Sequence, residues 1–151
     1  MQSIKQRLAH FNVPAHLIEL EITETAIMDD EEFGISVLQA LSALGISLSI
    51  DDFGTGYSSL GYLQRFPVNK LKIDQSFVRN MATDTRDQAL VLSICQLAKN
   101  LGLDIIAEGV EEHAQLEKLK EYNCDLIQGY LLSRPIPANE FEEFLAKGVS
   151  F

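Results

Sequence analysis

The chain has 151 residues, of which 22 are acidic and 12 are basic, and its formal net charge is −10. Such an acidic chain is poorly suited to nucleic-acid polymers or anionic membranes, so we expect neither as a partner. The sequence has no signal-peptide pattern and no apolar run of about 18 residues. These features predict a cytoplasmic protein with no membrane segment in this chain, although a parent protein can be tethered through other domains.

Five short segments have the apolar or alternating pattern of β-strands, with polar residues at their ends. They are residues 18–24, 46–52, 70–74, 104–108 and 125–130. Helical patterns follow at residues 31–44, 87–101, 114–122 and 139–146. Gly45 and Gly102 come directly after the first two, as is typical of helix ends. Strands that alternate with helices predict one α/β domain with a parallel sheet.

Two adjacent carboxylates, Asp51 and Asp52, end the second predicted strand and open a loop that contains Gly54 and Gly56. A straight strand would send the two side chains to opposite faces. A turn that begins at Asp52, eased by the glycines, would bring both carboxylates to one side, where they suit a divalent metal. The alternative at this point is an Asx-turn that binds no metal.

The third predicted strand places Lys72 on one face and the apolar Leu71 and Ile73 on the other. If the apolar face packs on helices, Lys72 points inward, where an ammonium is costly unless carboxylates meet it. The partners available at neighbouring strand ends are Asp51, Asp52 and Glu108. The alternative is an exposed edge strand with a solvated lysine.

The two cysteines are far apart in the sequence. Cys95 falls within a helical apolar pattern, and Cys124 precedes the last predicted strand. Their spacing matches no metal motif, so we predict that both are reduced and structural.

Five motifs, in order, are ELEITET, IDDFGTGYSSL, LKIDQSFV, IIAEGVE and IQGYLLSRPI. Together they resemble EAL-domain phosphodiesterases, which hydrolyse the bacterial messenger cyclic di-GMP. The resemblance spans nearly the whole chain. It implies a TIM-like (βα) barrel that is incomplete here, with about five C-terminal βα units present.

The resemblance also implies a metal site. Glu21 and Asp51 would bind a first ion, and Asp51, Asp52 and Glu108 would hold a second, with Glu108 counted among the catalytic residues. Hard oxygen ligands favour Mg²⁺ or Mn²⁺. Two such ions suit in-line cleavage of a phosphodiester, here to the linear dinucleotide pGpG.

Further roles follow from the same resemblance. Lys72 would be catalytic, because it orients or helps to activate the attacking water. Gln128 would contact a metal-bound water, and Asp74 would face a guanine of the substrate. Glu24 resembles the glutamate that anchors the loop after the second strand. Glu111 matches a further acidic position with a supporting role.

One departure concerns the start of the domain. The family begins with a strand that carries Glu-Ala-Leu, whose glutamate binds metal, and a later strand supplies an asparagine ligand; neither precedes Glu21. A complete barrel has about 250 residues. We therefore expect residues 1–151 to be the C-terminal part of one EAL domain, inactive as it stands.

Such a fragment has consequences for its partners. Two open sheet edges and an apolar interior predict self-association, or association with the missing N-terminal part. Cyclic di-GMP is the expected small-molecule partner of the intact domain. The alternative function is a degenerate EAL module that senses cyclic di-GMP or docks a protein without hydrolysis.

Overall fold

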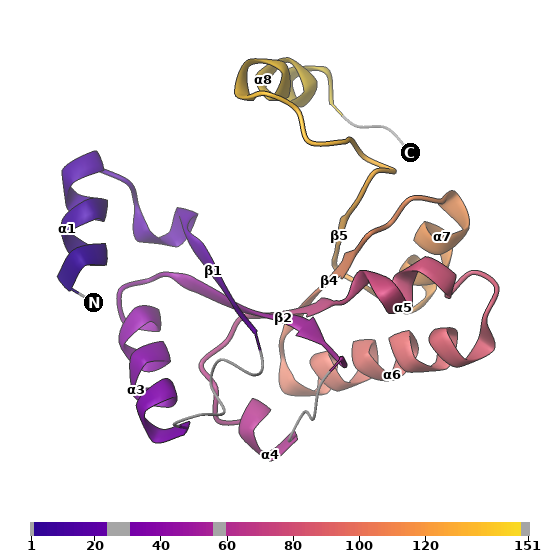
Figure 1. Cartoon of the computed structure of the whole chain (residues 1–151), viewed down its shortest axis with the longest axis horizontal. Coiled ribbons are helices and arrows are strands. Elements are labelled where there is room, and N and C mark those ends of the chain that lie inside the picture. Colours follow the sequence, from indigo (N-terminus) through magenta and orange to yellow (C-terminus); the bar gives the residue numbers. More distant parts are fainter. Residues whose placement is uncertain (1, 24–30, 56–59, 149–151) are drawn as a thin grey trace.

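The computed structural model describes residues 2–23, 31–55 and 60–148. Within these ranges, five parallel strands form one sheet in the order β1-β2-β3-β4-β5 (Figure 1). The strands are β1 (Glu19–Thr23), β2 (Ser47–Phe53), β3 (Lys70–Ile73), β4 (Asp104–Glu108) and β5 (Leu126–Gln128). Neighbours in the sheet follow each other in the chain, as they do in a (βα) barrel. The described sheet is not closed, because β1 and β5 both end it, and the predicted incomplete barrel is confirmed.

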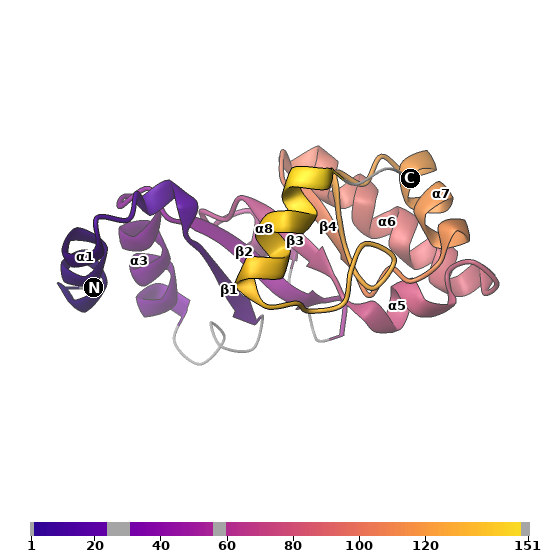
Figure 2. The ribbon, with the colours of Figure 1, turned by 90° about the horizontal axis from the view of Figure 1, so that it is seen from above.

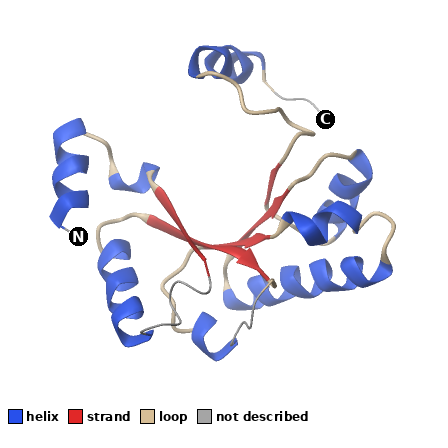
Figure 3. Ribbon diagram, viewed as in Figure 1, coloured by secondary structure: helices blue, strands red, loops and turns tan. Residues whose placement is uncertain are grey.

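Helices connect and flank these strands (Figure 3). They are α1 (Gln2–Phe11), the short 3₁₀ helix η1 (Ala15–Leu17), α3 (Glu31–Ser42), α4 (Leu60–Leu63), α5 (Gln75–Asn80), α6 (Thr85–Leu101), α7 (His113–Glu121) and α8 (Ala138–Lys147). The sequence predicted α3, α6, α7 and α8 to within a few residues, and it missed the others. None of the helices in the described ranges is both long and apolar enough to cross a membrane.

The start of α6 differs from the prediction by two residues because of its cap. Asp84 stands in extended conformation before the helix, and its carboxylate accepts hydrogen bonds from the backbone N–H groups of Arg86 and Asp87. These bonds satisfy donors that have no partner inside the first turn. At the other end, Gly102 adopts the left-handed conformation expected of a helix-terminating glycine.

The hydrophobic core lies between the sheet and the helices. Strand residues Leu48, Leu71 and Ile105 are fully buried there, and they pack with helix residues such as Val91 and Ala98. Alternation along each strand directs these side chains to one face. The helix layer therefore covers a single face of the sheet.

The opposite face, which lines the inside of the partial barrel, is polar over β2 and β3. Ser49 pairs in register with Lys70 on β3, and Lys70 makes an ion pair with Glu19 of β1. Lys72 occupies the next position on this face of β3. The prediction of an apolar interior is therefore wrong for these strands, because their apolar side chains point to the helices.

Helix α8 stands apart from the other helices. Figure 1 shows it on the far side of the sheet from α3 and α6, and Figure 2, seen from above, shows it crossing over the sheet. Its aromatic residues Phe141 and Phe144 stack at 6.4 Å between ring centroids. Phe141 and Leu145 are 48% and 59% exposed, so part of the apolar face of this helix is open to solvent.

Candidate active site

A buried ammonium lies among carboxylates at the carboxyl ends of the strands. Lys72 is 3% exposed, and its Nζ donates a hydrogen bond to Glu21 Oε1 at 2.6 Å. The same Nζ lies 2.7 Å from Glu108 Oε1 and 3.0 Å from Asp51 Oδ1. The predicted inward orientation of Lys72 is confirmed by this geometry. Asp51 and Glu108 contact Lys72 as expected. The third carboxylate in contact, among the described residues, is that of Glu21 and not that of Asp52.

The surroundings of Lys72 act on its charge in two directions. Burial disfavours the ammonium and lowers the pKa of Lys72, but the contacts with Glu108, Glu21 and Asp51 outweigh burial and raise this pKa above its ordinary value. The ammonium also offsets the mutual repulsion of these carboxylates, which converge from β1, β2 and β4.

Asp51 and Asp52 reach the same side of the sheet through an irregularity in strand pairing. Ile50 pairs with Leu71, but the next pair is Phe53 with Ile73, so two residues of β2 stand opposite one residue of β3. Such a bulge re-aims side chains next to active sites. Asp52 adopts a φ of +54°, which an aspartate tolerates better than most residues. The prediction of a shared side holds, but strand β2 continues through Asp52 instead of turning there.

Three carboxylates in the described residues form a group that fits a metal ion. Oxygen atoms of Asp51, Asp52 and Glu108 lie within 4.8 Å of one another. Moreover, the buried Oδ1 of Asp51 has no hydrogen-bond donor with proper geometry among the described residues. That oxygen faces the Lys72 ammonium at 3.0 Å and keeps a lone pair for a divalent cation, and an all-oxygen donor set suits Mg²⁺ or Mn²⁺. Glu21 lies outside this group but is joined to it through Lys72.

Asp52 of this group also lies close to a further carboxylate, that of Asp74. Burial, the charge of Asp51 and that of Asp74 raise the pKa of Asp52. Burial would also raise the pKa of Asp74, but hydrogen bonds from the Ser76 hydroxyl and backbone N–H outweigh it and lower that pKa. By accepting the hydrogen bond from the Ser76 backbone N–H, Asp74 also caps the N-terminus of α5, a role that was not predicted from the sequence.

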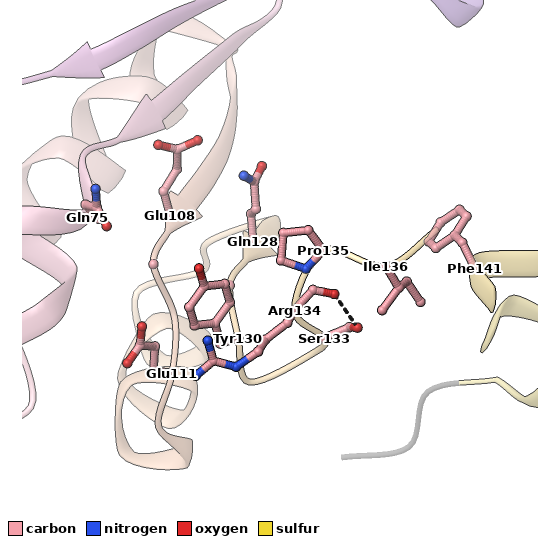
Figure 4. A pocket seen from close by; sticks show the side chains of 12 residues that line it. Gln75, Glu108, Glu111, Gln128, Tyr130, Ser133, Arg134, Pro135, Ile136 and Phe141 are labelled. Carbon is pink, nitrogen blue, oxygen red and sulfur yellow. Dashed lines mark hydrogen bonds between the residues drawn. The ribbon is translucent and has the colours of Figure 1, made fainter. Parts of the chain in front are cut away.

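A pocket of about 520 Å³ extends from Glu108 toward the loop after β5 (Figure 4). Gln128 and Glu111 line this pocket together with Glu108, and Glu111 lies toward its far end, on the side of Arg134. Further lining residues include Gln75, Tyr130 and Arg134. The Arg134 guanidinium lies 4.4 Å from the centre of the Tyr130 ring, in a cation–π contact. These three residues stand within the quoted motifs, but their side chains carried no signal from which a role was predicted.

Close backbone packing fixes the relative position of Glu108 and Gln128. The Val110 N–H donates to the Gln128 carbonyl at 3.1 Å, and the Leu131 N–H donates to the Val110 carbonyl at 2.9 Å. A Cβ added at Gly129 would lie 2.1 Å from the Val110 carbonyl oxygen. Only glycine permits this approach of the two segments. The predicted anchor Glu24, together with residues 56–59 of the loop it would hold, lies outside the described residues.

A parallel sheet with a lysine and carboxylates at the carboxyl ends of its strands is the arrangement of a (βα)-barrel enzyme. The sequence model of the EAL domain matches residues 1–135. The chain belongs to this family, and the resemblance seen in the sequence is confirmed.

Named relatives agree with this assignment. Cyclic di-GMP phosphodiesterase NbdA of Pseudomonas aeruginosa is 46% identical over 145 residues, which cover 96% of this chain and 18% of NbdA. The solved PaMucR phosphodiesterase in complex with c-di-GMP has a TM-score of 0.89 and 44% identity, and the match covers 93% of this chain and 57% of that chain. Klebsiella pneumoniae BlrP1, solved with manganese and cyclic di-GMP, has a TM-score of 0.81 and 35% identity, covering 89% of this chain and 34% of that chain. The chain thus spans less than two thirds of each of these relatives.

Proposed function

We propose that residues 1–151 form the C-terminal part of one EAL domain and that the intact domain hydrolyses cyclic di-GMP to pGpG. The observation that supports this most is the buried ammonium of Lys72 among Glu21, Asp51 and Glu108. One ammonium only partly offsets three carboxylates, so a site that accepts an anionic phosphodiester here also needs divalent cations. The named activity of NbdA supports the choice of substrate.

The proposed cofactor is Mg²⁺ or Mn²⁺, held by Asp51, Asp52 and Glu108, with Glu21 as a further ligand. The convergence of carboxylate oxygens supports this, as does the manganese in the BlrP1 structure. When bound, such ions would hold the phosphodiester and stabilise charge on the attacking and leaving oxygens.

Residues of the chain itself would orient the reactants. Lys72 presents N–H donors at the carboxyl end of β3, where they can orient an attacking water once substrate fills the site. Gln128 offers an amide to the same region from the end of β5, and Asp74 offers a carboxylate that can accept hydrogen bonds from a guanine edge. Glu108 holds the Lys72 ammonium in place.

The test is turnover by the full-length protein. Cyclic di-GMP incubated with protein and Mg²⁺ or Mn²⁺ should give pGpG, separated by chromatography, and a chelator should abolish the product. Binding of cyclic di-GMP without any turnover would instead favour a sensor module.

The isolated 151-residue chain should bind metal weakly and show negligible hydrolysis, because its sequence lacks the Glu-Ala-Leu and asparagine ligands. Calorimetric titration of this chain and of the full-length protein with Mn²⁺ would compare the two sites. Equal affinity and equal turnover would contradict the assignment of ligands to the absent strands.

A further inference from the structure

One uncharged polar side chain is buried beside the loop that follows Glu108. Gln115, in the first turn of α7, is 2% exposed, and its amide makes four hydrogen bonds. Its Oε1 accepts from the backbone N–H groups of Glu111 and Glu112, at 2.8 and 2.9 Å. Its Nε2 donates to the carbonyls of Val78 and Arg79, both at 3.2 Å. Both donors and both acceptor positions of the amide are thereby used.

Helix capping explains only one of these four bonds. Gln115 is the third residue of α7, and its bond to the Glu112 N–H belongs to a capping box at the start of that helix. A glutamate would serve equally well in such a box. The two bonds to α5 need N–H donors, which a glutamate carboxylate lacks. Glutamine, rather than glutamate, is therefore explained by the contact with α5.

This contact fixes a short helix that carries a site residue at its other end. Val78 and Arg79 lie toward the end of α5, where carbonyl groups lack partners within the helix. The N-cap of α5 is Asp74, whose carboxylate lies close to that of Asp52. Helix α5 has six residues and so spans about 9 Å. A displacement at Gln115 would therefore be passed along α5 to Asp74.

The acceptor half of the amide holds the loop that joins β4 to α7. This loop begins directly after Glu108, and Gln115 binds two consecutive N–H groups near its end. The loop also packs against the start of α5, since a Cβ added at Gly109 would lie 2.6 Å from Gln75 Cβ. Gln115 thus joins the loop that positions Glu108 to the helix that positions Asp74.

We propose that Gln115 is a positioning residue, which joins the loop after β4 to α5 and so fixes Glu108 and Asp74 relative to each other. The proposal rests on the proposed function, in which Glu108 binds a metal ion and Asp74 contacts the substrate. The two halves of the amide have separable effects. The acceptor half governs Glu108, and hence metal binding and kcat, whereas the donor half governs Asp74, and hence KM.

The first test needs no turnover. Gln115→Met fills a similar space but removes all four bonds, so the N–H groups of Glu111 and Glu112 should exchange with solvent at least about tenfold faster in the full-length protein. Its Mn²⁺ affinity in a calorimetric titration should fall by about tenfold or more, because Glu108 loses its fixed position. Gln115→Glu keeps the acceptor and should leave both values close to wild type. Wild-type Mn²⁺ affinity in Gln115→Met would overturn the proposal.

Steady-state kinetics with cyclic di-GMP separate the two halves of the amide. Gln115→Met should lower kcat by at least about tenfold and raise KM, whereas Gln115→Glu should mainly raise KM, because only its link to α5 is broken. Leu119→Ala is the matched control. Leu119 is a buried residue of the same helix, and its truncation lowers stability but removes none of the four bonds. This control should keep wild-type kcat, KM and Mn²⁺ affinity.

The outcomes distinguish this role from the proposed function. Absence of turnover by the wild-type protein would refute the phosphodiesterase activity, and the exchange and Mn²⁺ measurements would still decide the role of Gln115. Losses in Leu119→Ala as large as those in Gln115→Met would mean that any weakening of α7 disturbs the site, and they would overturn the proposal. Circular dichroism checks folding. Gln115→Glu retains the capping box, so its KM decides the matter if Gln115→Met does not fold.

Discussion

Lys72 is held by carboxylates from three strands, so its removal changes both the charge and the geometry of the candidate site. For the full-length protein, we expect Lys72→Ala to lower kcat by at least about 100-fold with a smaller change in KM, because the donor acts on the reacting groups. Lys70→Ala is the matched control, since Lys70 lies on the same strand and face but pairs with Glu19. Steady-state kinetics that left kcat of Lys72→Ala at the wild-type value would remove this residue from the mechanism.

Glu24 is proposed to anchor the loop after β2, and this role rests on the family resemblance. If it anchors this loop, Glu24→Gln should weaken metal affinity and activity together, by about 10- to 100-fold, as Asp52 loses its fixed geometry. Glu32→Gln, an exposed glutamate of α3, makes the same chemical change away from the site. Metal titration and kinetics on the full-length protein would measure both effects; wild-type values in Glu24→Gln would refute the anchoring role.

Gly129 permits the close contact between the segments after β4 and β5. A methyl group there would collide with the backbone of Val110, so Gly129→Ala should lower the free energy of unfolding by about 2–3 kcal/mol. Gly102→Ala is the control, because no atom lies within 4 Å of the added Cβ and only the left-handed φ of +71° opposes it. Urea unfolding compares the two variants. A larger loss in Gly102→Ala would contradict the steric explanation.

At the scale of elements, α6 depends on its cap. Asp84→Ala should destabilise the chain by about 1 kcal/mol, because two backbone donors of the first turn lose their acceptor. Asp84→Ser retains an accepting oxygen and should cost much less. The shift of the urea midpoint measures both changes. Equal losses would mean that the Asp84 charge, and not its hydrogen bonds, supports the helix.

The elements also show how far sequence patterns reach. Alternation predicted the strands and the inward direction of Lys72, because period two is imposed by strand geometry. Helix α1 was not predicted because the two residues that it packs against the core, Ile4 and Leu8, are too few to form a clear helical pattern. Helix α5 was not predicted because it is only six residues long. The bulge at Asp51 and Asp52 depends on pairing with β3, which no local pattern encodes.

Only part of the candidate site could be predicted, because contacts between strands are not encoded in local patterns. Carboxylates at strand ends could be named from position alone, since parallel strands end at one edge of the sheet. The contact between Glu21 and Lys72 could not, because it joins residues of β1 and β3 across β2.

At the scale of the whole molecule, the described sheet has two unpaired edges, at β1 and β5, and α8 exposes Phe141 and Leu145. Exposed strand edges and apolar patches favour association. We therefore expect the isolated 151-residue chain to self-associate, or to bind a polypeptide that carries the N-terminal part of the domain. Light scattering of the isolated chain should give a mass above the 16.8 kDa of one copy. This mass should fall when a polypeptide with the shorter N-terminal part of the domain is added and takes the place of the second copy in a dimer. A monodisperse monomer with full activity would contradict this expectation.

The separation of the two faces of β2 and β3 bears on how such a domain can evolve. Their apolar side chains belong to the layer shared with the helices, whereas Lys72 and Asp51 belong to the other side. Exchanges of charged residues on that side leave the packing of Leu48 and Leu71 untouched. A lineage can thus lose or retune its chemistry through point substitutions while the scaffold persists, and catalytic and non-catalytic descendants of one ancestor can keep the same architecture.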